Sequence, residues 1–212
     1  MIIFDLDGTL VDSLEGIAFS MNHVLDTSGF GTFPTLEYKK FVGEGIKRLV
    51  YKALPETHKD DGSVNEYYDF MCNIYREHYS EGMVLYSGIE ELLNKLTHLG
   101  LILAINTNKN QDVTDMIVAK YLKYWDFIKV IGSNSGFYKK PNPLGALTLA
   151  KLARFDPKDC LYIGDSEVDI LTAKNAGMTS ITVTWGFRSH AELLVHSPQN
   201  IVHYPNEILK YI

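Results

Sequence analysis

Short apolar runs, separated for the most part by helical patterns, constrain the fold of this chain more than any other feature. Runs that suit buried strands lie at Met1–Leu6, Leu101–Asn106, Phe127–Ile131, Cys160–Ile163 and Thr179–Val183. A strand that is buried on both faces of a parallel sheet is apolar throughout and does not alternate. Helical spacing over Ile89–Leu99 stops at Gly100, directly before the second run. The sequence therefore predicts an α/β fold with a parallel sheet.

The segment between the first two strands follows a different pattern. Apolar residues at helical spacing indicate helices around Ile17–Leu25, Ile46–Leu54 and Val64–Tyr79, with no convincing strand between them. A helical block of this size, placed inside an α/β pattern, is typical of an inserted small domain. We expect an all-helical domain over residues 14–82 and an α/β core made of residues 1–13 and 83–212.

Composition excludes several classes of protein. A net charge of -6 argues against sequence-independent binding of nucleic acid. Cys72 and Cys160 lie far apart, so we expect neither a disulfide scaffold nor a zinc site. This use of cysteine is typical of the reducing cytoplasm. No apolar run approaches the length that spans a membrane, and no basic signal segment precedes Asp5. We expect a cytoplasmic protein, a monomer or small homo-oligomer, that contacts no membrane.

Two aspartates follow the first apolar run. Asp5 and Asp7 are one residue apart, so the period of a strand would point both to the same side, and Gly8 then breaks the strand. Two anions held this close require either a raised pKa or a cation between them, so the pair predicts a divalent metal or a shared proton. The alternative is a turn at the strand end with two solvated aspartates.

Further polar residues flank the later apolar runs or the helices between them. They are Thr107–Asn108–Lys109, the pair Lys139–Lys140 before Pro141, Gly164–Asp165–Ser166, and Asp169. Parallel sheets place reactive groups at the carboxyl ends of their strands, so these side chains are expected to meet. Oxygen ligands from several aspartates suit Mg²⁺. Thr107 and Lys140 would then hold phosphate oxygens, although Thr107–Asn108 could instead cap the next helix.

Taken in their order along the chain, these polar residues resemble the motifs of the haloacid dehalogenase superfamily. The resemblance is to the subgroup that has a helical cap inserted after the first motif. Asp5–Thr9 is similar to its DxDGT motif, Thr107 to its second-motif hydroxyl residue, Lys140 to its third-motif lysine before proline, and Gly164–Asp169 to its GDSxxD motif. The resemblance covers nearly the whole chain. It implies a Rossmann-like sheet, a cap domain and Mg²⁺-dependent phosphatase activity on a small phosphorylated metabolite.

The resemblance also implies a role for each residue. Asp5 is the expected nucleophile and a metal ligand, and Asp7 the expected acid and base, with its backbone carbonyl on the metal. Asp165 completes the metal site, and Asp169 orients metal-bound water or Lys140. Thr107, Asn108 and Lys140 are the expected phosphate contacts.

The substrate is expected to be set by the helical insert. Its segment Gly43–Glu44–Gly45, followed by Lys47 and Arg48, resembles the cap segment of phosphoglycolate phosphatases. We expect these five residues to contact the substrate, with Lys47 or Arg48 meeting a carboxylate.

Three alternatives share part of this pattern. A phosphosugar mutase related to β-phosphoglucomutase has the same core and cap, but its cap usually carries a GxSR-like segment, which Gly43–Ile46 does not match. A haloalkanoic acid dehalogenase would not need Asp7. A phosphoacceptor signalling domain commonly places its aspartate after the third strand and has no large helical insert.

Overall fold

The computed structural model describes residues 1–134 and 136–212, which divide into two compact units. Residues 1–11 and 85–212 form the α/β unit, and residues 12–84 form the helical unit. The bounds predicted for the insert, 14 and 82, differ from these by two residues at each end. The connecting segments contain the short strands β2 (Val11–Asp12) and β3 (Val84–Leu85), which pair with each other. That the helical unit acts as a cap stays a prediction.

The α/β unit is built on a six-stranded sheet with the order β5-β4-β1-β6-β7-β8. Its strands are β1 (Ile2–Phe4), β4 (Leu103–Asn110), β5 (Phe127–Ser133), β6 (Leu161–Gly164), β7 (Thr179–Val183) and β8 (Ile201–Val202). Every pairing within it is parallel. The predicted Rossmann-like α/β class is therefore confirmed. β8 was not predicted, because a two-residue strand gives no pattern to recognise.

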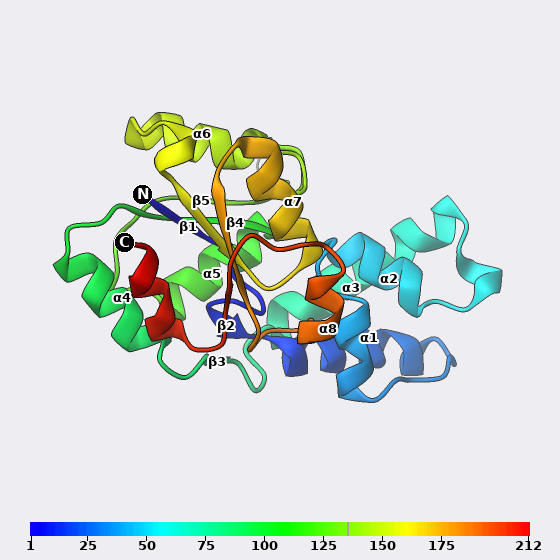
Figure 1. Cartoon of the computed structure of the whole chain (residues 1–212). Coiled ribbons are helices and arrows are strands. Elements are labelled where there is room, and N and C mark those ends of the chain that lie inside the picture. Colours follow the sequence, from blue (N-terminus) through cyan, green and yellow to red (C-terminus); the bar gives the residue numbers. More distant parts are fainter. Residues whose placement is uncertain (135) are drawn as a thin grey trace. The chain divides into compact units, whose positions relative to one another are not determined.

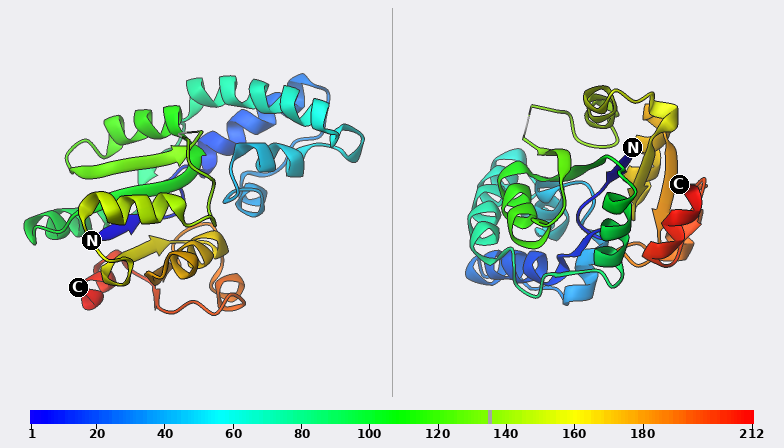
Figure 2. Two further views of the ribbon diagram at one scale, coloured as in Figure 1. Left: turned by 90° about the horizontal axis from the view of Figure 1, so that it is seen from above. Right: turned by 90° about the vertical axis from the view of Figure 1, so that its left-hand side faces the viewer.

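Helices cover both faces of this sheet (Figures 1 and 2). They are α4 (Ile89–His98), α5 (Gln111–Tyr121), α6 (Leu144–Ala153) and α7 (Glu167–Ala176), followed by α8 (His190–Leu194) and a 3₁₀ helix at Pro205–Tyr211. Right-handed crossovers place α6 and α7 on one face, because both connections run in the same direction across the sheet. There Ile3, Ala104 and Tyr162 pack against Leu149 of α6 and Ala173 of α7.

The helical unit contains α1 (Leu14–Thr27), α2 (Ile46–Ala53) and α3 (Asp61–His78). Short 3₁₀ helices lie at Thr35–Lys40 and Glu56–His58. α3 begins three residues before the predicted Val64, because the Asp60 side chain accepts the Ser63 N–H and caps the first turn. Its buried residues Val64, Met71 and Tyr75 form the apolar face.

The order of the strands determines where polar side chains gather. The chain leaves β1 toward β4 and β5, then crosses back to β6 on the other side of β1. The strand order therefore reverses around β1, and the carboxyl end of β1 is a topological switch point where α/β proteins bind ligands. Among the described residues, no helix has both the length and the apolar character that crossing a bilayer requires.

Candidate active site

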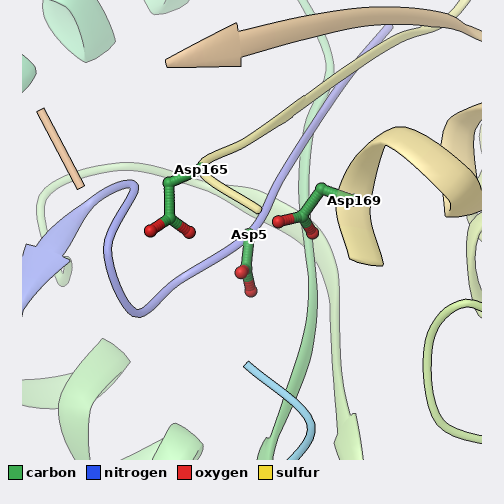
Figure 3. A group of neighbouring side chains, drawn as sticks. All are labelled: Asp5, Asp165 and Asp169. Atoms are coloured by element: carbon green, nitrogen blue, oxygen red, sulfur yellow. The ribbon is translucent and has the colours of Figure 1, made fainter. Parts of the chain in front are cut away.

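The acidic side chains lie at the carboxyl ends of two neighbouring strands. Phe4 pairs with Ile163 in β6, and the Asp5 N–H donates to the Ile163 carbonyl at 2.8 Å. Asp5 follows β1 and Asp165 follows β6, so the parallel register brings them to the same edge of the sheet. Asp169 joins them from the first turn of α7 (Figure 3).

These three carboxylates are buried and close together. Asp5 is 8% exposed, while Asp165 and Asp169 are each 2% exposed. One oxygen from each lies within 4.8 Å of the others. Buried carboxylates repel one another and lose their hydration, so such a group requires cations or protons.

Lys140 supplies one positive charge to this cluster. Its Nζ atom lies 2.6 Å from Asp169 Oδ1 and 2.9 Å from Asp5 Oδ1. Burial alone would lower the pKa of Lys140, but Asp169 and Asp5 outweigh it and hold this pKa well above its usual value. The neighbouring Lys139 is exposed. The geometry therefore places Lys140, and not Lys139, against the carboxylates.

Asn108 holds the backbone of Lys140 in place. The Lys140 N–H donates to Asn108 Oδ1 at 2.8 Å, and Asn108 Nδ2 donates to the Lys140 carbonyl at 3.1 Å. This pair of bonds links β4 to the segment before α6. The structure thus gives Asn108 a positioning role, and its direct contact with a substrate stays a prediction.

Asp169 is fixed on both of its oxygens. Oδ2 accepts hydrogen bonds from Ser166 Oγ at 2.6 Å and from the Ser166 N–H at 3.2 Å, as part of the capping box of α7. Oδ1 accepts from Lys140. Asp169 therefore stabilises the start of α7 and orients Lys140 at the same time.

Asp7 is held by a lysine to which the sequence analysis gave no role. Lys109 Nζ lies 2.9 Å from both carboxylate oxygens of Asp7. The lysine side chain is 2% exposed and that of Asp7 is 18% exposed. Strand periodicity could not have found this contact, because the pairing of β4 with β5 shifts register between Asn106 and Asn110.

Thr107 and Asn108 lie inside β4, which extends to Asn110. Asn110 is the residue that precedes α5, so Thr107 and Asn108 do not cap that helix. Thr107 is 5% exposed, and its Oγ1 accepts the Lys109 N–H at 3.3 Å. Its contact with a phosphate stays a prediction.

The residues expected to contact the substrate from the insert lie around the start of α2, within the helical unit. Gly43 and Gly45 both have positive φ angles, +113° and +89°, and Gly45 directly precedes α2. Glu44 Oε1 pairs with Lys52 Nζ at 2.7 Å. Lys47 and Arg48 are exposed on the first turn of α2. Their participation in a site stays a prediction.

Comparison with known proteins identifies the family. The sequence model of the haloacid dehalogenase-like hydrolases matches residues 2–183. The chain belongs to this family. A phosphoglycolate phosphatase of Chromobacterium violaceum is 33% identical over 196 residues, which cover 91% of this chain and 88% of that protein. A phosphoglycolate phosphatase of Vibrio vulnificus is 31% identical over 207 residues, which cover 95% of this chain and 90% of that protein.

Solved structures of the haloacid dehalogenase-like family agree with this result. A crystal structure of a predicted phosphoglycolate phosphatase from Haemophilus somnus superposes with a TM-score of 0.89 at 28% identity, covering 100% of this chain and 96% of that one. The relatives and the fold together make this chain a phosphatase of the haloacid dehalogenase type. Phosphatases of this family generally use Mg²⁺.

The charges of the site fit a divalent cation. Burial, followed by the charges of Asp169 and Asp5, raises the pKa of Asp165 well above its usual value. Burial also raises the pKa of Asp5 to about 7, although Lys140 opposes this shift. Three buried carboxylates thus face one lysine among the described residues, and the excess charge sits on oxygen ligands of the kind that Mg²⁺ prefers.

The raised pKa of Asp5 predicts that Asp5→Asn stabilises the metal-free protein at alkaline pH. Between 3.8 and about 7 the folded protein holds a proton that the unfolded chain has released, so stability falls as pH rises through this window. Asparagine avoids this loss. The gain in free energy of unfolding should be smallest near pH 4 and should grow as the pH rises through about 7.

Urea unfolding in a chelator measures this gain through the fluorescence of Trp125 and Trp185, which both belong to the α/β unit. Asp156→Asn is the control, because the Lys158 N–H lowers the pKa of Asp156 and the sign should reverse. An Asp5→Asn protein less stable than wild type at about pH 8 would contradict the assignment of excess negative charge.

Proposed function

We propose that this chain is a Mg²⁺-dependent phosphoglycolate phosphatase that works through an aspartyl-phosphate on Asp5. The observation that carries the proposal is the buried contact of Lys140 with both Asp5 and Asp169, next to Asp165, at the switch point of the sheet. A carboxylate paired with a fixed cation at such a point is suited to attack an anionic phosphate.

In the first step an oxygen of Asp5 attacks the phosphorus atom. A bond forms between phosphorus and this oxygen, and the bond from phosphorus to the leaving oxygen breaks. Asp7 donates its proton to the leaving oxygen, which departs as an alcohol. Lys140 offsets the negative charge of Asp5 and of the phosphoryl group during this transfer, because its Nζ already lies against Asp5.

In the second step water attacks the phosphorus atom and releases Asp5. Asp7 takes the proton from the water as its oxygen bonds to phosphorus, and the bond from phosphorus to Asp5 breaks. One residue serves both steps because the first leaves it in the form that the second requires. Thr107 and backbone N–H groups of the site would hold the phosphoryl oxygens.

The chain offers ligands for a metal ion at the same place. Asp5, Asp165 and the backbone carbonyl of Asp7 would hold Mg²⁺, while Asp169 keeps Lys140 against Asp5. When bound, the ion would neutralise the charge that keeps an anionic nucleophile and an anionic ester apart.

The proposed substrate has a carboxylate two bonds from its leaving oxygen. Support comes from the named activity of the relatives in Chromobacterium violaceum and Vibrio vulnificus. The exposed cations Lys47 and Arg48, directly after a glycine-rich turn, are suited to bind a carboxylate.

Replacement of Lys140 tests the site against a matched neighbour. Lys140→Met should lower kcat by roughly 10²- to 10³-fold, because it removes a preorganised cation from the transferring group. Lys139→Met should leave kcat within about twofold of wild type, since this side chain is exposed. Steady-state rates with 2-phosphoglycolate measure the effect of both replacements, and unfolding curves test whether both variants fold. Equal rates for the two variants would remove Lys140 from the mechanism.

The substrate is tested with a panel of phosphate esters. 2-Phosphoglycolate should exceed ethyl phosphate in kcat/KM by about tenfold or more, which corresponds to about 1.4 kcal/mol from the carboxylate contact. Sugar phosphates, nucleotides and pyrophosphate complete the panel, and a mutase would convert a sugar phosphate without releasing phosphate. Lys47→Met and Arg48→Met should reduce the preference over ethyl phosphate. A flat profile across the panel rejects phosphoglycolate as the substrate.

A further inference from the structure

The loop that follows β7, Thr184–Arg188, contacts the first and fourth motifs of the site. Trp185 Nε1 donates to the Thr9 carbonyl at 3.0 Å, and the Phe187 N–H donates to Asp165 Oδ2 at 2.7 Å. Both contacts lie within the α/β unit. The loop thus supplies a backbone donor to one of the proposed metal ligands.

The loop approaches Asp165 so closely that a side chain would not fit at its centre. A Cβ atom on Gly186 would overlap the Asp165 carboxylate and the Gly8 carbonyl. A Cβ atom on Gly8, where φ is +79°, would overlap the same carboxylate. Backbone from two segments therefore encloses Asp165 and fixes the space that its carboxylate can occupy.

A partly buried ion pair ties the end of this loop to the helix that carries Asp169. Arg188 is 9% exposed, and its Nε and Nη2 lie 3.0 Å and 3.4 Å from the two carboxylate oxygens of Glu167. Glu167 is the first residue of α7, between Asp165 and Asp169 in the chain. The two contacts use both oxygens of Glu167, which makes the pair directional.

We infer that Arg188 is a positioning residue for the metal site: through Glu167 it holds the Phe187 N–H on Asp165 and so fixes this carboxylate for a divalent cation. The inference rests on the proposed function, because it needs a metal at Asp165. Partners behind a metal ligand commonly orient it, and their loss weakens metal binding.

The sign of the effect separates positioning from simple electrostatics. Arg188 is a positive charge close to Asp165. If only charge mattered, removing it would make the site more negative and would tighten the binding of a cation. If Arg188 positions the ligand, removing it loosens binding. The two accounts therefore predict opposite changes in the dissociation constant of Mg²⁺.

The experiment titrates Mg²⁺ into the metal-free full-length chain by calorimetry. Arg188→Met should weaken Mg²⁺ binding by roughly 10- to 100-fold. Arg188→Lys keeps the charge but loses the two-point contact, so it should also bind more weakly, whereas electrostatics alone predicts no change. Lys210→Met, at the exposed pair of Lys210 with Glu207, should bind as wild type does.

Kinetics give an independent readout. The Mg²⁺ concentration for half-maximal activity should rise in both Arg188 variants, while kcat at saturating Mg²⁺ should stay within about threefold of wild type. A general loss of structure would lower kcat as well. If Arg188→Met does not fold, Arg188→Lys alone carries the test.

Each outcome decides the question. Wild-type binding of Mg²⁺ with equal or tighter binding by the Arg188 variants overturns the inference and leaves the proposed function intact. A wild-type protein that binds no Mg²⁺ overturns the proposed metal site and the inference with it. Weaker binding by both variants supports the positioning role.

Discussion

The contact of a buried lysine with two buried aspartates is the constraint on which the rest of the site depends. Asp5 and Asp169 come from different elements, and Lys140 joins them at 2.9 Å and 2.6 Å. Without this cation, the buried carboxylates of Asp5 and Asp169 would lack the lysine that compensates their charge, which costs several kcal/mol per buried ion. The strand order, the Asn108 contact and the capping box of α7 all act to bring these three groups together.

The distribution of partners explains where the negative charge remains. Asp169 is bound by Ser166 and Lys140, and Asp7 is bound by Lys109. Among the described contacts, Asp165 has the backbone donor of Phe187, and Asp5 shares Lys140. The uncompensated charge therefore falls on Asp5 and Asp165, whose pKa values are both raised. This is where a nucleophile and a metal ligand are proposed.

Much of the fold could be predicted because its signals are local. Apolar runs specify buried strands, and the strands bring Asp5 and Asp165 to the same edge of the sheet. The residues that were missed depend on tertiary contacts. β4 extends through Asn106–Asn110, a polar stretch that resembles a loop until its burial is known. The contact of Asn108 with Lys140 and the approach of Gly186 to Asp165 join residues far apart in the chain. The roles predicted for the helical insert involve contacts with a substrate, and they stay predictions.

The central claim is that Asp5 becomes covalently phosphorylated, and trapping this intermediate tests it most directly. The protein is mixed with 2-phosphoglycolate and Mg²⁺, quenched rapidly, reduced with borohydride and digested for peptide mass spectrometry. An acyl phosphate on an aspartate is converted to homoserine by this treatment. The account predicts homoserine at position 5 and unmodified aspartate at position 7. Turnover without any modification at position 5, or with the modification at another aspartate, would contradict it.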